Sequence, residues 1–421
     1  MNNFTTDTYE LKREIVNFSK KLTQNTNKVE KKFTLDMIYG ISKSKTTVLS
    51  GIADSLNEKI KRINTIDRLS VNLSKDLDNS INDNYLKLAI DELKEKPVII
   101  VDDSDVVKPT ASKFEDLGIV RDGSKSTKTK SVYEKGYHVT EIIGVTKNQR
   151  QPISLYSRIH SSEEKEYKSN NDETFKALDK IISALNRRAI FAFDRGYDFN
   201  NLFKYMEDKN QDYIIRLTEK RNLFYERKWY KSATLRDSRK GKIKMKVWFQ
   251  GEKKDCYVSH KKVQITAMKK PVTVVFMYGL GDTPMMLATN LIISSKDNVI
   301  DVVRTYMSRW RIEEYFKFKK QEYDFENFRV RGLKAINNLN SMLSYTLGII
   351  AILAEKMNKN ILTTKILNRA NSLRNDVLLW SYQISRGIYK ILSHAKTGIR
   401  EWQNVRKTKV IDNQLCLDLC T

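Results

Sequence analysis

Residues 97–105 read Pro97-Val-Ile-Ile-Val-Asp-Asp-Ser-Asp105, a continuous apolar run followed at once by an acidic block. Short apolar runs of this kind are typical of a β-strand that is buried on both faces of a sheet. A second such run, residues 189–193, ends in Asp194. The sequence therefore predicts two buried strands, each with a carboxylate at its end.

The neighbouring segments complete a mixed α/β sheet. Residues 138–145 and 152–159 read as two strands joined by the turn Lys147-Asn148, which predicts an antiparallel pair. Helical patterns at 172–185 and 199–207 flank the second buried run, and a further strand follows at 212–216. Because strand ends in open α/β sheets are where sites form, the acidic residues at these ends are candidate ligands.

A third carboxylate comes from a helix late in the chain. Residues 299–320 have a helical pattern, and each helical residue turns by about 100°. Tyr306, Arg309, Glu313 and Lys320 then lie within about 60° of one another on one face. A carboxylate flanked by cations and a phenol suits a site that holds a metal ion and a phosphate together.

Asp103, Asp194 and Glu313 are the predicted catalytic metal ligands. Three carboxylates from two strands and a helix suit two Mg²⁺ ions, which prefer oxygen ligands and can be replaced by Mn²⁺. Asp102 is the alternative to Asp103. Adjacent residues of an extended strand point to opposite faces, so only one of the two can face the ions.

The charge of the chain predicts a polyanionic partner. The 421 residues have a net charge of +25 and a pI near 9.6, which favours nucleic acid over an acidic membrane surface. Residues 212–290 hold 18 Lys and Arg against 7 Asp and Glu, so the basic excess is concentrated inside the chain. No basic amphipathic helix is evident, and the apolar segment 342–354 is too short to span a bilayer.

Within this basic region the pattern changes to a period of two. Lys242, Lys244 and Lys246 share one face of an extended strand, and we expect that face to contact DNA phosphates. Trp248 and Phe249 are expected in the core of the same unit. An exposed Trp in this region would be able to stack on a base.

The remaining regions read as helical. Residues 42–47 are interpreted either as the opening of a DNA-recognition helix or as part of a helical cap. His138, His160, His260 and His394 are scattered and show no ligand pair in sequence, and Cys416 and Cys420 are interpreted as incidental thiols of a cytosolic protein. The N-terminus shows no apolar signal region.

The pattern Tyr306-x₂-Arg309-x₃-Glu313-x₆-Lys320 resembles the Y-R-E-K signature of bacterial insertion-sequence transposases with a DDE catalytic domain. Residues 194–198 (Asp-Arg-Gly-Tyr-Asp) are similar to that family's second acidic block, and residues 101–104 (Val-Asp-Asp-Ser) to its first, where Thr is commoner than Ser.

The resemblance implies a ribonuclease-H-like fold with a β-rich insertion. It divides the chain into a helical DNA-binding region (1–95), a catalytic domain (96–217 and 285–335), a basic insertion (218–284) and a C-terminal helical region (336–421). Tyr306, Arg309 and Lys320 would contact phosphates.

The implied function is a cut-and-paste DNA transposase. It would act as a homodimer on double-stranded transposon ends and target DNA, in the bacterial cytoplasm on the nucleoid. The enzymes that it resembles form a hairpin on the transposon end, and the sequence leaves open whether this chain does so. The alternatives are a metal-dependent nuclease of the same fold without strand transfer, and a non-enzymatic DNA-binding protein derived from a transposase.

Overall fold

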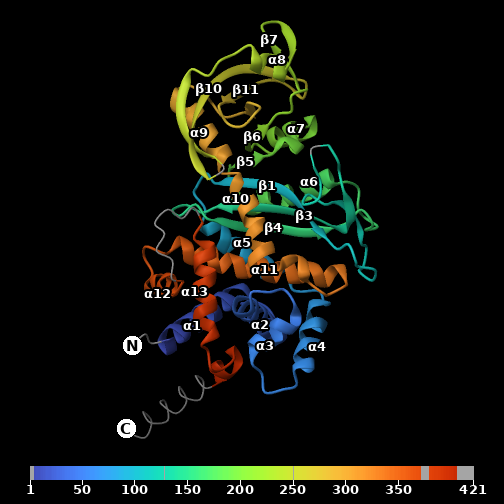
Figure 1. Ribbon diagram of the computed structural model, residues 1–421, viewed down its shortest axis with the longest axis vertical. Helices are drawn as coiled ribbons and strands as arrows, with labels where there is room; N and C mark the ends of the chain where they lie inside the picture. The colour runs from blue at the N-terminus through green and yellow to red at the C-terminus, as the bar shows by residue number, and fades with distance from the viewer. Residues whose placement is uncertain (1–3, 128, 250, 371–378, 405–421) are drawn as a thin grey trace.

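The computed structural model describes residues 4–127, 129–249, 251–370 and 379–404. The molecule is elongated and has three parts along its long axis (Figure 1). A β-rich part lies at one end, a sheet with flanking helices lies in the middle, and a helical body formed by the first and last described helices lies at the other.

The middle part is built on five strands in the order β4-β3-β1-β5-β6. Strand β3 runs antiparallel to β1 and β4, whereas β5 and β6 run parallel to β1. This is the mixed sheet expected of a ribonuclease-H-like fold, and the predicted antiparallel pair is confirmed as β3 and β4. The strands are β1 (Val98–Val107), β3 (Tyr133–Val145), β4 (Pro152–His160), β5 (Ile190–Phe193) and β6 (Asp212–Arg216).

Strand β1 is longer than its apolar run predicts. It continues to Val107, so the acidic block lies inside the strand and pairs with β3. Residues 99–101 pair with β3 on one side and β5 on the other, which explains why this part is uniformly apolar. From Asp102 onward only β3 is paired, so the strand turns polar where its second neighbour ends.

Helices cover the sheet. Helix α6 (Asn170–Leu185) packs on β3 and β4, and α7 (Asn200–Asp208) packs on β6. Helix α10 (Trp310–Lys317) crosses β1 and β4, and it follows α9 (Lys296–Met307) after a short break.

The insertion extends the central sheet rather than forming a separate one. Strand β12 (Met285–Thr289) pairs with β6 and carries the insertion strands outward to give a 12-stranded sheet. Three valines of α9 pack on the inner face of β9 in a second hydrophobic core. The insertion elements are β7 (Asn222–Tyr225), β8 (Lys228–Lys231), α8 (Ser232–Asp237), β9 (Ile243–Phe249), β10 (Glu252–Ile265) and β11 (Met268–Tyr278).

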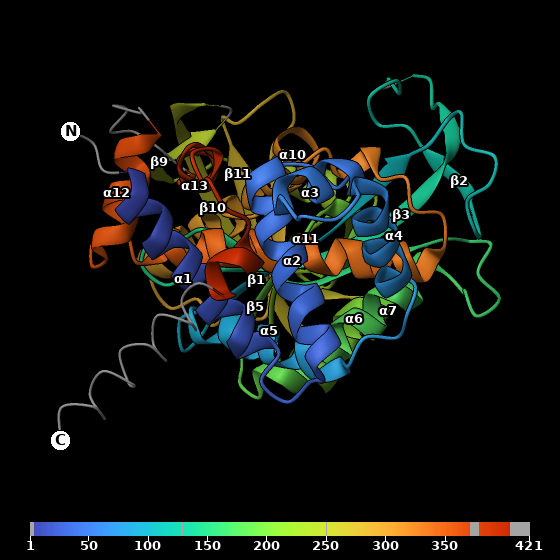
Figure 2. The ribbon, with the colours of Figure 1, turned by 90° about the horizontal axis from the view of Figure 1, so that it is seen from below.

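The N-terminal and C-terminal helices form one body. Helix α1 contacts α12 and α13, and ion pairs join Arg369 to Asp7 at 2.5 Å and Lys365 to Glu10 at 2.8 Å. Seen from below, the N-terminal helices lie over α11 (Figure 2). Cys416 and Cys420 lie outside the described residues. The helices are α1 (Phe4–Leu22), α2 (Lys28–Ser44), α3 (Leu49–Leu56), α4 (Arg62–Leu73), α5 (Asn79–Asp91), α11 (Leu333–Glu355), α12 (Ile361–Arg369) and α13 (Ser381–Ser393).

Residues 42–47 do not open a recognition helix. They end α2 and form the turn to α3, with Lys45 in the left-handed conformation that terminates α2. This turn faces the protein: Lys45 pairs with Glu322, and the Thr47 hydroxyl donates to the carbonyl of Asp324 at 3.0 Å. The turn therefore joins the helical body to the segment that follows α10.

Helix α11 is the core of the helical body. It runs for 23 residues, so the argument that its apolar segment is too short to cross a membrane was wrong. In length and composition it would span a bilayer, but 83% of its most apolar window is buried inside the protein. It lies along β4 and under α2, α4 and α5, which accounts for its apolar character on all sides.

A buried ion pair anchors the segment that follows α10. The chain passes there into the π-helical turn Phe318–Glu322, whose Lys319 is 0% exposed. The Lys319 ammonium donates to Glu141 on β3 at 2.9 Å and to Asn340 on α11 at 2.9 Å. Two serine hydroxyls donate to the same Glu141 carboxylate, so the buried charge is fully hydrogen-bonded. Glu141 is the register partner of Asp102 across β1 and β3, so this pair ties the end of α10 to the acidic strand.

We expect Lys319→Ala to lower the free energy of unfolding by about 3–5 kcal/mol, because it leaves the Glu141 carboxylate buried and unpaired. Lys317→Ala is the matched control, since Lys317 pairs with Glu314 on the exposed face of the same helix and should cost less than about 1 kcal/mol. Urea titration of both variants measures the difference. Equal stabilities would show that the Lys319–Glu141 pair does not hold this segment.

Candidate active site

The register of β1 and β5 places two carboxylates side by side. The last pair of the parallel ladder is Val101 with Phe193, and the next residues of the two strands are Asp102 and Asp194. Neighbouring strands lie about 4.8 Å apart, so these aspartates leave the sheet edge as adjacent side chains. Asp194 also accepts a hydrogen bond from the backbone of Arg195, which begins a short 3-10 turn.

Arg309 joins this edge to the late helix. One guanidinium nitrogen donates to Asp102 Oδ2 at 2.9 Å and the other donates to Glu313 Oε1 at 2.5 Å. The Arg309 side chain is only 5% exposed. Burial disfavours its charge, but the neighbouring anionic groups, Asp194 included, outweigh burial and raise the pKa of Arg309 above its ordinary value. A permanent positive charge therefore lies among three carboxylates.

Asp103 points to the opposite face of β1. Thr140 Oγ1 donates to Asp103 Oδ1 at 2.9 Å, and the Tyr197 hydroxyl donates to Asp103 Oδ2 at 2.8 Å. Both carboxylate oxygens are thus engaged by neighbours on the side of the sheet away from Arg309. The structure places Asp102 and Asp194 at neighbouring strand ends and links Asp102 to Glu313 through Arg309. Asp103 lies outside this arrangement.

The hydrogen bond between Asp103 and Tyr197 has a structural role. Tyr197 closes the 3-10 turn that starts after Asp194, and its ring is buried. Through this bond the turn is fastened to β1 directly beside Asp102. Asp103 therefore helps to set the spacing between Asp102 and Asp194.

Tyr306 and Lys320 lie on either side of Arg309 along the chain. The predicted continuous helix is broken at Ser308 and Arg309 and ends in the π-helical turn. The prediction that Tyr306, Arg309, Glu313 and Lys320 share one helical face is therefore only partly right. Tyr306 is buried, and its hydroxyl has no hydrogen-bond partner among the described residues. Lys320 donates to the carbonyl of Asp105 at 2.8 Å and pairs with Glu326 at 3.0 Å. Lys320 thus reaches the far end of the acidic block rather than Glu313.

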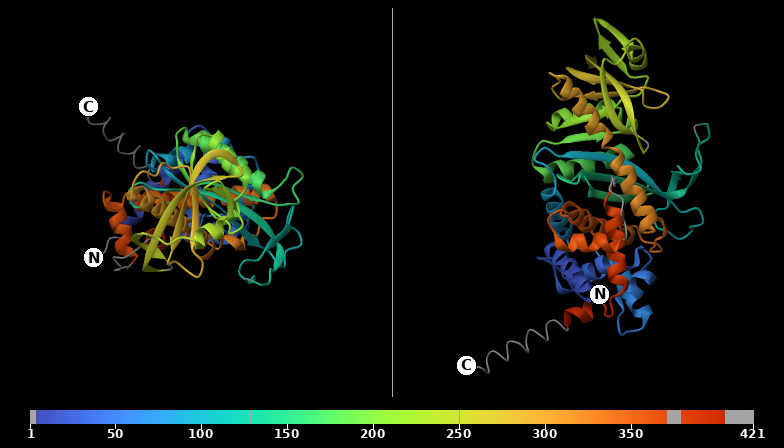
Figure 3. Two further views of the ribbon diagram at one scale, coloured as in Figure 1. Left: turned by 90° about the horizontal axis from the view of Figure 1, so that it is seen from above. Right: turned by 60° about the vertical axis from the view of Figure 1, so that its left-hand side comes forward.

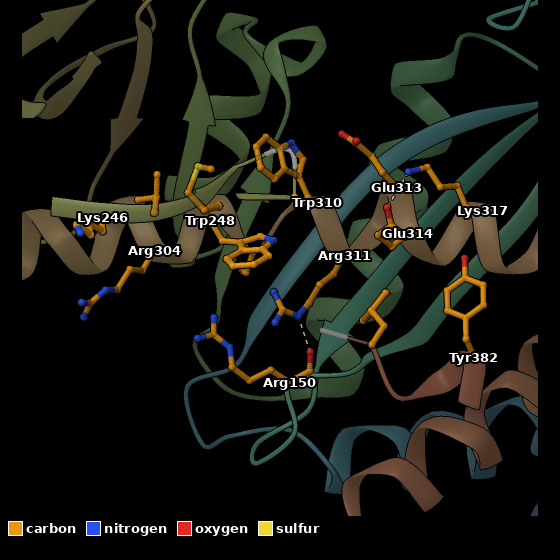
Figure 4. A pocket seen from close by; sticks show the side chains of 15 residues that line it. Arg150, Lys246, Trp248, Arg304, Trp310, Arg311, Glu313, Glu314, Lys317 and Tyr382 are labelled. Atoms are coloured by element: carbon orange, nitrogen blue, oxygen red, sulfur yellow. Dashed lines mark hydrogen bonds and ion pairs between the residues drawn. The ribbon is translucent and has the colours of Figure 1, made fainter. Parts of the chain in front are cut away.

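A basic cavity opens next to Glu313 (Figure 4). Its volume is about 820 Å³, and it lies between β9, the α9–α10 break and the β3–β4 turn. Within the described parts of the chain, Arg150, Lys246 and Arg304 make no ion pair, so the cavity has uncompensated positive charge. Its wall includes the basic and aromatic residues Arg150, Lys246, Trp248, Arg304, Trp310 and Arg311.

The outer strand of the insertion contributes one wall. Lys244 and Lys246 on β9 and Lys242, which directly precedes it, are exposed, as predicted, although Lys244 pairs with Asp255 at 3.0 Å. Trp248 is 40% exposed on the same face of β9 as Lys244 and Lys246, so its predicted core position was wrong. The alternation that buries Phe249 necessarily turns Trp248 outward with the lysines.

The structure pairs two histidines that appear scattered in the sequence. His138 and His160 are register partners on β3 and β4, with ring centroids 5.7 Å apart. His138 contacts Asp105 at 2.8 Å, and His160 contacts Thr140 at 3.0 Å. The predicted turn does not give this pairing, because His138 lies 9 residues before Lys147 and His160 lies 12 residues after Asn148, and a β-bulge at Ile142 and Ile143 shifts the register. In the described residues, however, no group of three His, Cys, Asp or Glu side chains is placed to hold a metal ion.

Comparison with known proteins assigns the family. Residues 93–347, more than half of the chain, match the family model described as "Transposase DDE domain". The chain belongs to the DDE transposases. The match covers both acidic strands, the insertion and α10, and it ends within α11.

One similar solved structure is a "Cryo-EM structure of piggyBac transposase synaptic complex with hairpin DNA", at 9% identity and a TM-score of 0.45. That comparison covers 96% of this transposase and 84% of the other chain. A search of curated protein sequences found no match.

The environment of Asp102 gives the transposase a titrating group near neutral pH. Burial is the largest cause and raises the pKa of Asp102 to about 7; Arg309 acts in the opposite direction, and the charge of Asp194 adds to the rise. An unfolded chain has an Asp pKa of about 3.9. Between about pH 4 and pH 7, the folded state therefore retains a proton on Asp102 that the unfolded state has released.

We expect the stability of the metal-free protein to fall as the pH rises from about 4 to 7, by up to about 1.4 kcal/mol per pH unit from this group. Asp102→Asn removes this titrating group, so the unfolding free energy of the variant should decrease less than that of the wild type over the same pH interval. Urea titrations in EDTA at several pH values measure the two slopes. Parallel curves for wild type and variant would contradict a raised pKa at Asp102.

Proposed function

We propose that this transposase cleaves DNA at the ends of a mobile element with divalent metal ions and then joins the freed 3′-hydroxyl to target DNA. The observation that carries the proposal is the meeting of Asp102 and Asp194 in register at the sheet edge, with Glu313 joined to them through Arg309. Carboxylates at the ends of adjacent parallel strands are suited to metal ligands.

The donor set fits a divalent cation. Asp102, Asp194 and Glu313 offer only carboxylate oxygens, which Mg²⁺ and Mn²⁺ prefer over nitrogen or sulfur. The Arg309 guanidinium already places a positive charge between Asp102 and Glu313, and thus stands in for a cation. We infer that Arg309 leaves this position when ions bind. Two bound ions would supply an activated water or hydroxyl and stabilisation of the leaving oxygen.

The residues around the carboxylates are arranged to hold a phosphodiester. Once released from Asp102, the Arg309 guanidinium can form a bidentate contact with phosphate. The free Tyr306 hydroxyl is a second donor, and Lys320 lies at the end of β1. These contacts would orient the scissile phosphate, so that a water or the 3′-hydroxyl attacks it in line.

The basic cavity beside Glu313 is the proposed path of the DNA strand at the cleavage site. Arg150, Arg304 and Lys246 would neutralise phosphates, and exposed Trp248 offers a stacking surface at the wall of the cavity. Lys242 and Lys244 continue this path along β9.

The resemblance to insertion-sequence transposases supports a proposed oligomeric state and cellular location. They are a homodimer that holds two transposon ends, and action on the nucleoid in the bacterial cytoplasm. A strand-transfer assay with a pre-cleaved end separates this function from that of a nuclease of the same fold. Cleavage without joining would assign the nuclease, and DNA binding without either reaction would assign a non-enzymatic protein.

Glu313→Ala should retain DNA binding and lose cleavage, because it removes a metal ligand while leaving the basic surfaces intact. Binding is measured by fluorescence anisotropy, and cleavage by the release of a labelled strand in Mg²⁺ and in Mn²⁺. Cleavage at the wild-type rate by this variant would refute the assignment.

Asp102→Asn and Asp103→Asn distinguish the two adjacent aspartates. We expect Asp102→Asn to abolish cleavage, since Asn is a poor ligand for Mg²⁺. Asp103→Asn should lower the rate by only about 10- to 100-fold, as is typical for a residue that orients ligands. Binding of Mn²⁺ by calorimetry gives a second readout. The opposite ranking would show that Asp103 faces the ions.

A further inference from the structure

A two-stranded ribbon projects from the central sheet. Strand β2 (Gly118–Arg121) pairs antiparallel with residues 133–136 at the start of β3. The β1–β3 pairing stops at Gly136, so within the described part of the chain β2 is the one strand that pairs with residues 133–135. Figure 3 shows this ribbon and its loop extending away from the body of the molecule. None of the predicted site residues lies on it.

One face of the ribbon combines cations with large apolar side chains. Ile119 pairs with Lys135, and Arg121 pairs with Tyr133, so the four side chains share a face. Ile119 is 57% exposed and Tyr133 is 64% exposed, while the alternate residue Val120 is buried. Arg121 and Lys135 are exposed and make no ion pair within the described residues. This face therefore presents contact area and positive charge without an internal partner.

The loop of the ribbon is stabilised at its start. Asp122 is buried and accepts hydrogen bonds from the Ser124 backbone at 2.9 Å and from the Ser124 hydroxyl at 2.6 Å. The backbone N–H of the same Asp122 donates to the carbonyl of Val132 at 2.9 Å, which closes the loop across its neck.

The base of the ribbon is fastened to the catalytic part. Glu115 precedes β2, and its carboxylate accepts from the backbone of Leu333 at 2.6 Å, the first residue of α11. Lys108, which follows β1, donates its backbone N–H to the carbonyl of Lys135 at 2.7 Å. A pre-ordered surface loses less conformational entropy on binding than a flexible one.

A second basic cavity of about 550 Å³ lies at the base of the ribbon. Lys113, Arg329 and Arg331 line it and make no ion pair within the described residues. The Lys135 ammonium reaches the carbonyl of Ala111 in the cavity wall at 3.4 Å, so the ribbon face and the cavity are continuous. Together they form one basic surface at the end of β1, with Lys320 beside it.

We propose that this surface, the β2–β3 ribbon with its basal cavity, docks on duplex DNA next to the cleavage site. A two-stranded ribbon fits the major groove of B-DNA. Arg121 and Lys135 would contact phosphates or base edges, and Tyr133 and Ile119 would pack on sugars and thymine methyl groups. DNA is favoured as the occupant because the cations of this surface, on the ribbon and in its basal cavity, make no ion pair within the described residues and a polyanion would neutralise them.

The inference rests on the proposed function, since DNA must approach the carboxylates for the ribbon to reach it. The position of the ribbon means that it would contact a different part of the DNA from the part at the carboxylates. The cavity lined by Arg150 and Lys246 lies between Glu313 and the insertion strand β9. The ribbon instead continues from the C-terminal end of β1, where Val107 pairs with Gly136. Two basic surfaces on different sides of the carboxylates would hold the duplex on both sides of the cut.

The test is the salt dependence of DNA binding by the full chain in EDTA, measured by fluorescence anisotropy with a short labelled duplex. Because no cleavage occurs in EDTA, this readout is independent of the metal-ligand assignment. Arg121→Ala/Lys135→Ala should weaken binding by about 30-fold at 0.15 M salt and lower the log–log salt slope by about 2. The matched control is Lys180→Ala/Lys204→Ala, exposed cations on α6 and α7, which should change neither value.

Equal effects of the two double variants, or no effect of the ribbon variant, would overturn the proposal. Ile119→Asp/Tyr133→Asp adds a second readout through its oligomeric state by sedimentation velocity. We expect this variant to bind DNA more weakly with an unchanged sedimentation coefficient in the absence of DNA. A changed coefficient together with unchanged DNA affinity would assign the ribbon to a contact between copies of the chain and would also overturn the proposal.

Discussion

The active site depends on the register between two parallel strands. Val101 pairs with Phe193 at the last rung of the β1–β5 ladder, and this one pairing makes Asp102 and Asp194 neighbours. A shift of one residue in either strand would turn an aspartate to the other face of the sheet. The apolar residues of both strands are buried on two faces, so the hydrophobic core itself resists such a shift.

The third carboxylate is held by charge and by packing. Arg309 is nearly buried between Asp102 and Glu313, where an unpaired guanidinium would carry a large desolvation penalty. Downstream, Lys319 and Glu141 fasten the π-helical turn to β3, directly across from Asp102. π-Helical turns are rare and occur frequently at functional sites. Here the turn allows Lys319 to face the core while Lys320 reaches the acidic strand.

The sequence predicted the central sheet because its strands have strong local signals. Residues 97–101 and 189–193 are uniformly apolar, and residues 138–159 have the pattern of a hairpin. That pattern does not show which of Asp102 and Asp103 faces the metal ions. Alternation shows that they face opposite sides of the sheet, but α10 decides which side receives Glu313, and its packing involves residues far away in the chain.

Other predictions failed where tertiary contacts outweigh local patterns. Trp248 was assigned to the core together with Phe249, yet the strand buries its neighbours Val247 and Phe249 and leaves Trp248 at the basic cavity. The apolar segment of α11 was judged by length alone, whereas burial between the sheet and the helical body explains its composition. The ribbon at β2 gave no signal in the sequence, because a short strand in a polar loop reads as irregular structure.

The central claim is that Asp102 and Asp194 are the strand ligands of the metal ions in this transposase. Anomalous diffraction from crystals of the DNA complex grown with Mn²⁺ tests it most directly, because the signal locates the ions independently of any assumed ligand. The account predicts a peak in contact with the carboxylates of Asp102 and Asp194. A peak bound by Asp103, or by Asp194 without Asp102, would contradict it.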